Sequence, residues 1–214
     1  MTRTLLCFGD SNTHGSPPME SRVEPYRRYG EDSRWPRVAG AALGAGWTIV
    51  EEGLPGRTAQ FDDPGMGAWM NGQMGLRIAL ASHGPIDWLA IMLGTNDCKT
   101  RFGGRPETIT AGIASLIDIA LGSEAQDRHG GFEILLICPP PVEERGCLAG
   151  EFLGGAATGR QLAPLYRALA EGRGCRFLDA GKHIGVSPID GVHLSPESQQ
   201  TLGRAAASAI RSGN

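Results

Sequence analysis

The sequence lacks most of the features that mark secreted, membrane and nucleic-acid-binding proteins. Its five cysteines are odd in number and none forms a C-x-x-C pair, which argues against a disulfide framework and favours the reducing cytoplasm. No apolar run approaches the ~20 residues that cross a bilayer. The N-terminal run Leu5–Phe8 is too short for a signal peptide. The lack of a long apolar run leads us to expect no membrane partner, and the net charge of only −3 leads us to expect no nucleic-acid partner.

Several well-known functional motifs are missing as well. There is no H-E-x-x-H and no cysteine pair or acidic loop with ligand spacing, so we expect no metal. There is no G-x-x-x-x-G-K-[ST] and no G-x-G-x-x-G, so we expect no nucleotide cofactor and no other cofactor. The absence of a G-x-S-x-G elbow argues against an α/β-hydrolase.

What the sequence does contain is an alternation of short apolar runs and helical patterns. The runs predict strands at Thr4–Phe8, Thr48–Glu51, Trp88–Leu93, Glu133–Cys138 and Arg176–Leu178. The patterns predict helices from a cap at Asp32 or Ser33 to Leu43, over Gly72–Ser82 after Asn71, over Pro106–Leu121, over Thr158–Glu171, and from Ser195-Pro196 to about Arg211. Nearly continuous apolar strands are typical of a parallel sheet buried on both faces. The sequence therefore predicts one α/β domain over residues 1–214, with a five-stranded parallel sheet in flavodoxin-like order.

Three stretches rich in Gly, Pro and charge interrupt this alternation. They are Ser16–Glu31, Gln60–Met70 and Pro139–Ala157. Long loops in compact domains are usually functional or form interfaces. The first and third follow predicted strands, so we expect them to shape a pocket or a subunit contact at the carboxyl edge of the sheet.

Three segments carry groups that suit ester chemistry. Gly9-Asp10-Ser11 ends the first predicted strand, Asn96 follows the third, and Asp190 precedes His193 by three residues near the end of the chain. Open α/β sheets bind ligands at the carboxyl edge, where such side chains meet. A serine hydroxyl needs a base to become a nucleophile, and His193, oriented by Asp190, is the candidate base.

Two further groups are candidate donors to an oxyanion. The side-chain amide of Asn96 is well placed at the middle of the sheet edge, and Gly56 can offer its N–H at close range because it has no side chain. Each segment alone has a plainer interpretation. Asn96 and Gly56 can simply hold tight turns, and Asp190 can cap one beside a surface histidine. The combination is what favours catalysis.

Together, Ser11, Gly56, Asn96 and Asp190-x-x-His193 match in order and spacing the four sequence blocks of the SGNH (GDSL-type) hydrolases. The strings Glu51–Leu54, Ile91–Asp97 and Asp190–His193 look most like the small intracellular arylesterase/acyltransferase branch. The resemblance implies a three-layer α/β/α sandwich. It also implies that Ser11 is the nucleophile, His193 the base and Asp190 its orienting acid, with an oxyanion hole made by the N–H groups of Ser11 and Gly56 and the Asn96 side chain.

The chain departs from this pattern beside the serine. Asn12 stands where an apolar residue is commoner, and His14 stands where related acyltransferases often carry an aromatic residue. Together with Asp10, both are expected to contact the substrate. The resemblance implies a cytoplasmic serine esterase acting on short-chain, acetyl-type esters of aryl or alkyl alcohols or sugars. For some members it also implies acyl transfer and assembly into homo-oligomers.

Two other functions stay open at this point. A GDSL lysophospholipase or thioesterase would take longer acyl chains and would need a long apolar channel. A non-catalytic carbohydrate-binding relative would keep the fold without turnover. Rates over a series of acyl lengths separate the first from an acetylesterase, and covalent labelling of Ser11 separates the second.

Overall fold

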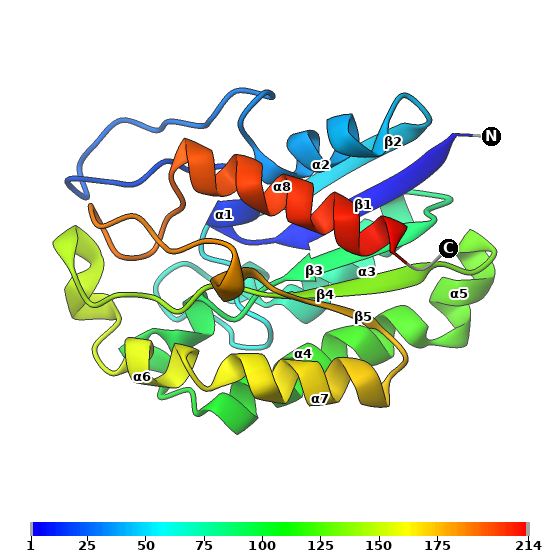
Figure 1. Ribbon diagram of the computed structural model, residues 1–214. Helices are drawn as coiled ribbons and strands as arrows, with labels where there is room; N and C mark the ends of the chain where they lie inside the picture. The colour runs from blue at the N-terminus through cyan, green and yellow to red at the C-terminus, as the bar shows by residue number, and fades with distance from the viewer. Residues whose placement is uncertain (1, 213–214) are drawn as a thin grey trace.

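The computed structural model describes residues 2–212, and its centre is a five-stranded parallel sheet (Figure 1). The strands are β1 (Arg3–Gly9), β2 (Trp47–Gly53), β3 (Trp88–Met92), β4 (Glu133–Cys138) and β5 (Arg176–Asp179). Their order in the sheet is β2-β1-β3-β4-β5, and every pairing is parallel. This is the flavodoxin-like order that the sequence predicts, with the strand order reversing between β1 and β3.

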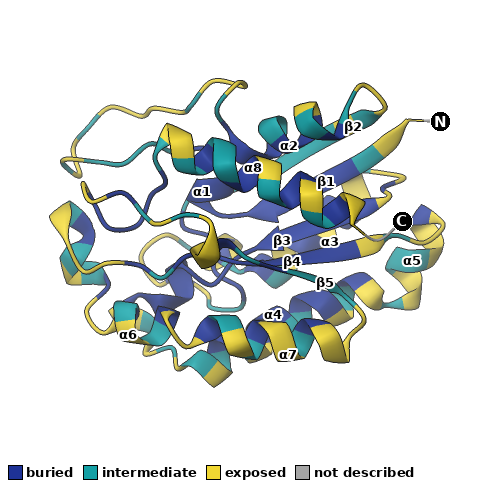
Figure 2. Cartoon of the chain, in the orientation of Figure 1, coloured by how far each residue is buried: buried dark blue, intermediate teal, exposed yellow. Residues whose placement is uncertain are grey.

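Helices cover both faces of the sheet, which confirms the three-layer α/β/α arrangement (Figure 1). On one face lie α2 (Trp35–Leu43) and α8 (Pro196–Arg211); on the other lie α3 (Gly72–Ser82), α4 (Pro106–Leu121) and α7 (Leu162–Gly172). Shorter helices are α1 (Ser11–His14), α5 (Ser123–His129) and α6 (Gly155–Gly159). Figure 2 shows β3 and most of β1 and β4 buried, β2 and β5 mainly intermediate, and exposed residues on the outward faces of α7 and α8.

Alternate residues of each central strand feed two separate apolar cores. Leu6 and Phe8 of β1 pack in the core under α3, α4 and α7, whereas Leu5 and Cys7 pack in the core under α2 and α8. Successive side chains of a strand point to opposite faces. A continuous apolar run is therefore what a strand covered on both faces requires.

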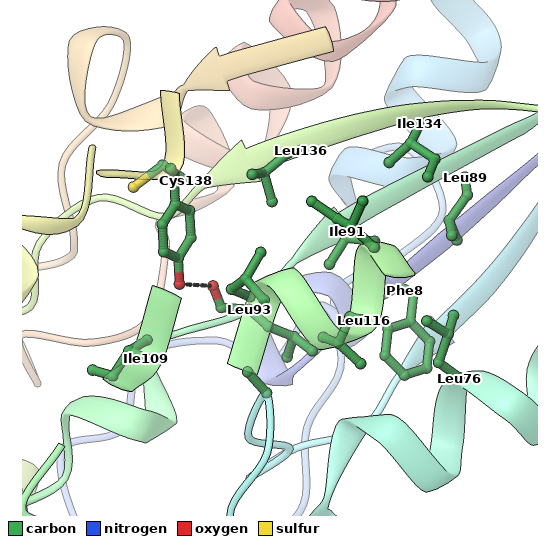
Figure 3. Packing of buried hydrophobic residues seen from close by; sticks show 14 of the residues in the cluster. Phe8, Leu76, Leu89, Ile91, Leu93, Ile109, Leu116, Ile134, Leu136 and Cys138 are labelled. Atoms are coloured by element: carbon green, nitrogen blue, oxygen red, sulfur yellow. Dashed lines mark hydrogen bonds between the residues drawn. The ribbon is translucent and has the colours of Figure 1, made fainter. Parts of the chain in front are cut away.

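The core also fixes the end of β3, where the polar segment begins (Figure 3). The buried hydroxyl of Tyr166 donates a hydrogen bond to the Leu93 carbonyl at 3.2 Å. Gly94 follows with φ +119°, and a Cβ there would lie 2.3 Å from the Tyr166 hydroxyl oxygen. Glycine is thus required at the point where the chain turns from β3 toward Asn96.

Two predicted caps are confirmed by their hydrogen bonds. The Asn71 side chain accepts from the Gln73 N–H at 3.0 Å at the start of α3. The Ser195 hydroxyl accepts from the Ser198 N–H at 3.2 Å at the start of α8. Both are the N-cap bond that satisfies a free donor of the first helical turn.

Two predicted helices are wrong in detail. Helix α2 begins at Trp35 after Arg34, without a side-chain cap, so neither Asp32 nor Ser33 caps it. The single helix predicted over Thr158–Glu171 is broken, because α6 ends at Gly159 and α7 begins at Leu162. The break places Pro164 in the first turn of α7, where its missing N–H costs no helical hydrogen bond.

Within residues 2–212, no single helix is both long and apolar enough to cross a bilayer. Helices α4 and α5 reach that length and composition only as a pair that is bent by 50° at its junction. The buried side of α4 packs in the core under the sheet, through residues such as Ile109, Ile113 and Leu116.

Candidate active site

The structure brings together three side chains that are distant in sequence. Ser11 is the first residue of α1, directly after β1 ends. Its Oγ lies 3.1 Å from Nε2 of His193, and Nδ1 of the same ring lies 2.6 Å from Oδ2 of Asp190. Ser11 and His193 are each 6% exposed and Asp190 is 0% exposed. This is the hydroxyl–imidazole–carboxylate line that activates a serine for attack.

Asp190 is held by the backbone around it. Its Oδ1 accepts the N–H groups of Val192 at 3.0 Å and His193 at 2.9 Å, and its Oδ2 also accepts the Met19 N–H at 2.9 Å. Burial by itself raises the pKa of Asp190, but the bonds from the ring and backbone of His193, the charge of His193 and the Met19 N–H together lower it below its ordinary value. An ionised Asp190 keeps the proton of the neutral ring on Nδ1, which leaves Nε2 free to accept from Ser11.

Asn12 holds the loop that carries His193 and does not line the cavity. Its side-chain amide donates to the Val192 carbonyl at 3.2 Å, and its Oδ1 accepts the Leu194 N–H at 3.1 Å. Gln199 of α8 donates to the Asn12 carbonyl at 2.8 Å. The residues on both sides of His193 are therefore bonded to the residue that follows Ser11. An apolar side chain at position 12 could not make these bonds.

Asp10 and His14 are not among the residues that line the cavity either, so its geometry does not support the substrate contact expected for these three residues. Asp10 is buried and caps α1, with its Oδ1 accepting the Asn12 N–H at 2.9 Å. Burial raises the pKa of Asp10 to about 6. The His14 ring is 2.7 Å from the Tyr26 hydroxyl. The sequence places these residues next to Ser11, but their side chains bond to other parts of the chain and do not line the cavity.

Two backbone N–H groups that belong to buried, cavity-lining residues have no partner in the described part of the chain. They belong to Ser11 and Gly56, and neither donates to any residue of 2–212. Buried N–H groups in folded proteins are nearly always paired. Gly56 has φ +94°, a backbone conformation that other residues adopt only with strain. These donors are available for an oxygen that enters the cavity.

Asn96 lies on the same cavity, beside these two groups. Its side-chain nitrogen donates to the Arg57 carbonyl at 3.1 Å and is 3.4 Å from Oδ2 of Asp10. The first bond orients the amide. The second contact is long for an N–H···O bond, so this hydrogen is only weakly bonded in the free protein.

The carboxylate of Asp97 supports the Gly56 segment from inside. Its two oxygens lie 2.9 and 3.0 Å from the Ala59 nitrogen and accept its N–H, and the side chain is fully buried. Burial raises the pKa of Asp97 to about 7. The folded protein therefore binds a proton at Asp97 more tightly than the unfolded chain does.

This shift predicts a pH-dependent contribution to stability. A carboxyl with a raised pKa in the folded state stabilises the fold at low pH, and this contribution falls as pH rises from about 4 to about 7. Relative to Asp97→Asn, the free energy of unfolding of the wild type should fall by about 2–3 kcal/mol between pH 5 and pH 8. Urea unfolding at both pH values measures it, with the exposed Asp127→Asn as control. Asp127→Asn should show the same pH-dependent loss as the wild type. If Asp97→Asn and Asp127→Asn lose equal free energy of unfolding between the two pH values, the raised pKa does not belong to Asp97.

A cavity of about 500 Å³ opens over Ser11, His193, Gly56 and Asn96. All three long loops contribute to its walls, through Pro17 and Met19, through Gly65 and Met66, and through Leu148 and Phe152. The expected pocket at the carboxyl edge is therefore present. A larger hollow of about 700 Å³ between α3, α4 and α5 contains none of the catalytic candidates and is a surface groove.

Sequence reasoning missed two cations at the site. Arg57 is buried, stacks over the Phe8 ring at 4.1 Å and donates to the carbonyls of Gly9, at 3.0 Å, and of Glu52. Burial lowers its pKa to about 10. It ties the end of β1 to the segment after β2, which positions Ser11 and Gly56 relative to each other. Lys99 lies in the cavity wall three residues after Asn96, a spacing that could have marked it.

The family model described as GDSL-like Lipase/Acylhydrolase matches residues 7–201, so the chain belongs to this family. A carbohydrate acetylesterase from Sinorhizobium meliloti is 39% identical, with a TM-score of 0.91 and 99% of each chain covered. The aryl esterase of M. smegmatis is 36% identical, with a TM-score of 0.92 and 99% of each chain covered. None of the curated proteins compared with the chain matches it. The SGNH resemblance and the fold expected from it are confirmed.

Proposed function

We propose that the protein is a serine esterase that hydrolyses short-chain, acetyl-type esters of aryl or alkyl alcohols or of sugars through an acyl-enzyme. One observation carries the proposal. The bonded line of Ser11, His193 and Asp190 opens on a cavity whose lining includes Ser11 and Gly56, two buried residues whose backbone N–H groups have no partner among residues 2–212. The relatives described as a carbohydrate acetylesterase and an aryl esterase support this substrate class.

The geometry supports the following sequence of steps. Ser11 Oγ attacks the ester carbonyl while His193 Nε2 takes its proton, and Asp190 stabilises the resulting imidazolium without accepting that proton. The N–H groups of Ser11 and Gly56 and the amide of Asn96 bind the oxyanion. One such side-chain donor typically contributes ~3–4 kcal/mol to lowering the barrier. His193 then protonates the leaving alkoxide. Water, or a second alcohol in acyl transfer, releases the acyl group with His193 again as base.

Charged groups in the walls of the cavity disfavour a long acyl chain that would lie along them. Arg22, Lys99, Arg101 and Glu151 line the cavity together with apolar residues such as Met19, Leu148 and Phe152. An alkyl chain gains little from contact with charged groups, and it costs free energy to remove those groups from water. A short acyl group needs only the apolar part of this lining, whereas a long chain would also meet the charged part.

The acyl-length profile tests the proposal against the lysophospholipase or thioesterase alternative. For p-nitrophenyl esters from acetate to decanoate, kcat/KM should be highest at two to four carbons and fall at least about tenfold by eight, since each mismatched methylene costs ~1–3 kcal/mol in a site that cannot take it. A maximum at eight to ten carbons would favour the alternative. No turnover of any ester would contradict the proposed function itself.

We also propose that the protein is cytoplasmic and forms a homo-oligomer. All five cysteines are free thiols, which suits a reducing compartment. On the loop at the cavity mouth, Val23 is 90% and Tyr26 75% exposed; Trp69, just before α3, and Ile78, in α3, are 63% and 60% exposed. Apolar residues that gather into an exposed patch often mark contacts, and these four are the candidate contact residues. Light scattering should give a multiple of 22.6 kDa; a monomer mass would contradict the assembly, and recovery from the culture medium would contradict the compartment.

A further inference from the structure

Lysine is rare in this chain, and one of its two lysines lies in the wall of the catalytic cavity. Lys99 is 7% exposed, whereas Lys182 is exposed at the surface. Lysine is almost never buried to this extent unless it is paired. The environment of Lys99 therefore needs an explanation.

Lys99 has no hydrogen-bond acceptor for its ammonium group among residues 2–212. Its Nζ is 3.8 Å from Oε2 of Glu151 and 5.9 Å from the centre of the Phe152 ring. Glu151 is itself bound by Arg22 and, at 2.8 Å, by Arg101. The carboxylate of Glu151 is thus shared among three cations.

Counting charges over this cluster leaves Lys99 as the surplus cation. Arg101 also pairs with Asp63 at 3.2 Å. Two carboxylates, Glu151 and Asp63, then face three cations, Arg22, Arg101 and Lys99. The Asp10 charge is near enough to act on Lys99, but that carboxylate is buried behind the wall, where it caps α1.

The surplus charge lies on the same wall as an oxyanion donor. Lys99 ends the 3-10 turn that begins at Asn96, and its N–H donates to the Asn96 carbonyl at 3.1 Å. Side chains three residues apart in a 3-10 helix lie above one another. Both side chains line the cavity. A group bound by Lys99 would therefore belong to the ester held at Ser11.

We propose that the cavity takes esters whose alcohol part carries an anionic group, such as a carboxylate, and that Lys99 pairs with this anion. The inference rests on the proposed function: if the acyl group is of the acetyl type, it is too short to carry an anionic group, and the anion must belong to the alcohol part. An anionic sugar and a carboxylated aryl alcohol share this chemistry. Lys99 is accordingly a specificity-determining residue for the alcohol part.

The electrostatics of Lys99 agree with this role. Burial lowers the pKa of Lys99 and the neighbouring Arg101 lowers it further; the charges of Asp63 and Asp10 raise it, but they do not restore its ordinary value. The ammonium is therefore incompletely compensated in the free protein. The carboxylate of a substrate would give this ammonium a hydrogen-bond partner, in place of the hydration that burial takes from it.

The test compares two substrates that differ in charge and little in size, 4-acetoxybenzoate and 4-acetoxybenzamide. The ratio of their kcat/KM values, anionic over neutral, should exceed one in the wild type and fall about tenfold in Lys99→Gln. The ratio is measured in one preparation, so loss of active enzyme cancels. Lys182→Gln removes the same charge from the surface and should leave the ratio unchanged. Glu151→Gln removes a negative charge from the cluster and should raise the ratio about threefold.

These outcomes separate the inference from the proposed function. If the wild type hydrolyses neither compound, the esterase proposal fails and the inference fails with it. If it hydrolyses both and the ratio is the same in wild type and Lys99→Gln, only the inference is overturned. If Lys99→Gln does not fold, Glu151→Gln decides: a raised ratio supports the anionic subsite, and an unchanged or lowered ratio overturns it.

Discussion

Replacing Ser11 by alanine should lower kcat for p-nitrophenyl acetate by about 10⁵- to 10⁶-fold, the loss typical when a serine nucleophile is removed. The substitution deletes the oxygen that lies 3.1 Å from His193 Nε2 and leaves in place the backbone N–H groups of residues 11 and 56, the proposed oxyanion donors. The remaining turnover would come from binding and the oxyanion hole alone. Steady-state kinetics on purified protein measures the loss.

The variant should fold normally, because the Ser11 hydroxyl makes only the bond to His193 among residues 2–212. Its melting temperature should stay within a few degrees of wild type. The exposed Ser82→Ala, at the end of α3, is the matched control and should keep full activity. Wild-type rates in Ser11→Ala would remove the mechanism proposed here.

The same variant separates an esterase from a carbohydrate-binding relative. An organophosphonate should add once to the wild type, at Ser11, and not at all to Ser11→Ala, because only an activated serine is phosphonylated at a useful rate. Mass spectrometry of the intact protein and its peptides reads this directly. An inert Ser11 in a protein that still binds glycans would favour the binder.

Sequence alone predicts the fold and the positions of the catalytic candidates well, for a local reason. Each candidate follows a strand or precedes a capped helix, and parallel strands bring such ends to one edge. Ser11 after β1, Asn96 after β3 and His193 before α8 are cases of this rule. No contact across the molecule has to be known in order to place them.

What the sequence could not predict are side-chain directions and long-range partners. Asn12 is adjacent to Ser11, yet its amide reaches to Val192 and Leu194, 180 and 182 residues away. In the sequence Arg57 follows Gly56 in a predicted tight turn, but in the structure its guanidinium lies buried over the Phe8 ring. The surplus charge of Lys99 depends on Asp63 and Glu151. That surplus exists only once three loops have come together.

Asp190→Asn should lower kcat by about 10³- to 10⁴-fold while leaving Ser11 and the oxyanion donors in place. An amide nitrogen opposite His193 Nδ1 donates a hydrogen bond instead of accepting one. The ring then carries its proton on Nε2, where it can no longer accept from Ser11. The carboxylate is fully buried and accepts three backbone N–H groups.

This variant should also lose stability, which makes its control important. The Met19 N–H shares Oδ2 of Asp190 with the His193 ring, so an amide nitrogen there leaves that N–H unpaired, at a cost of about 1–3 kcal/mol. Urea unfolding gives the stability loss, and kinetics at a temperature where the variant is fully folded gives the catalytic loss. Asp118→Asn, which breaks an exposed ion pair with Arg173, should change neither by much. Loss of stability cannot lower kcat when kcat is measured per folded active site. A kcat within tenfold of wild type in folded Asp190→Asn would therefore show that the Asp190 carboxylate anchors the loop and does not orient His193.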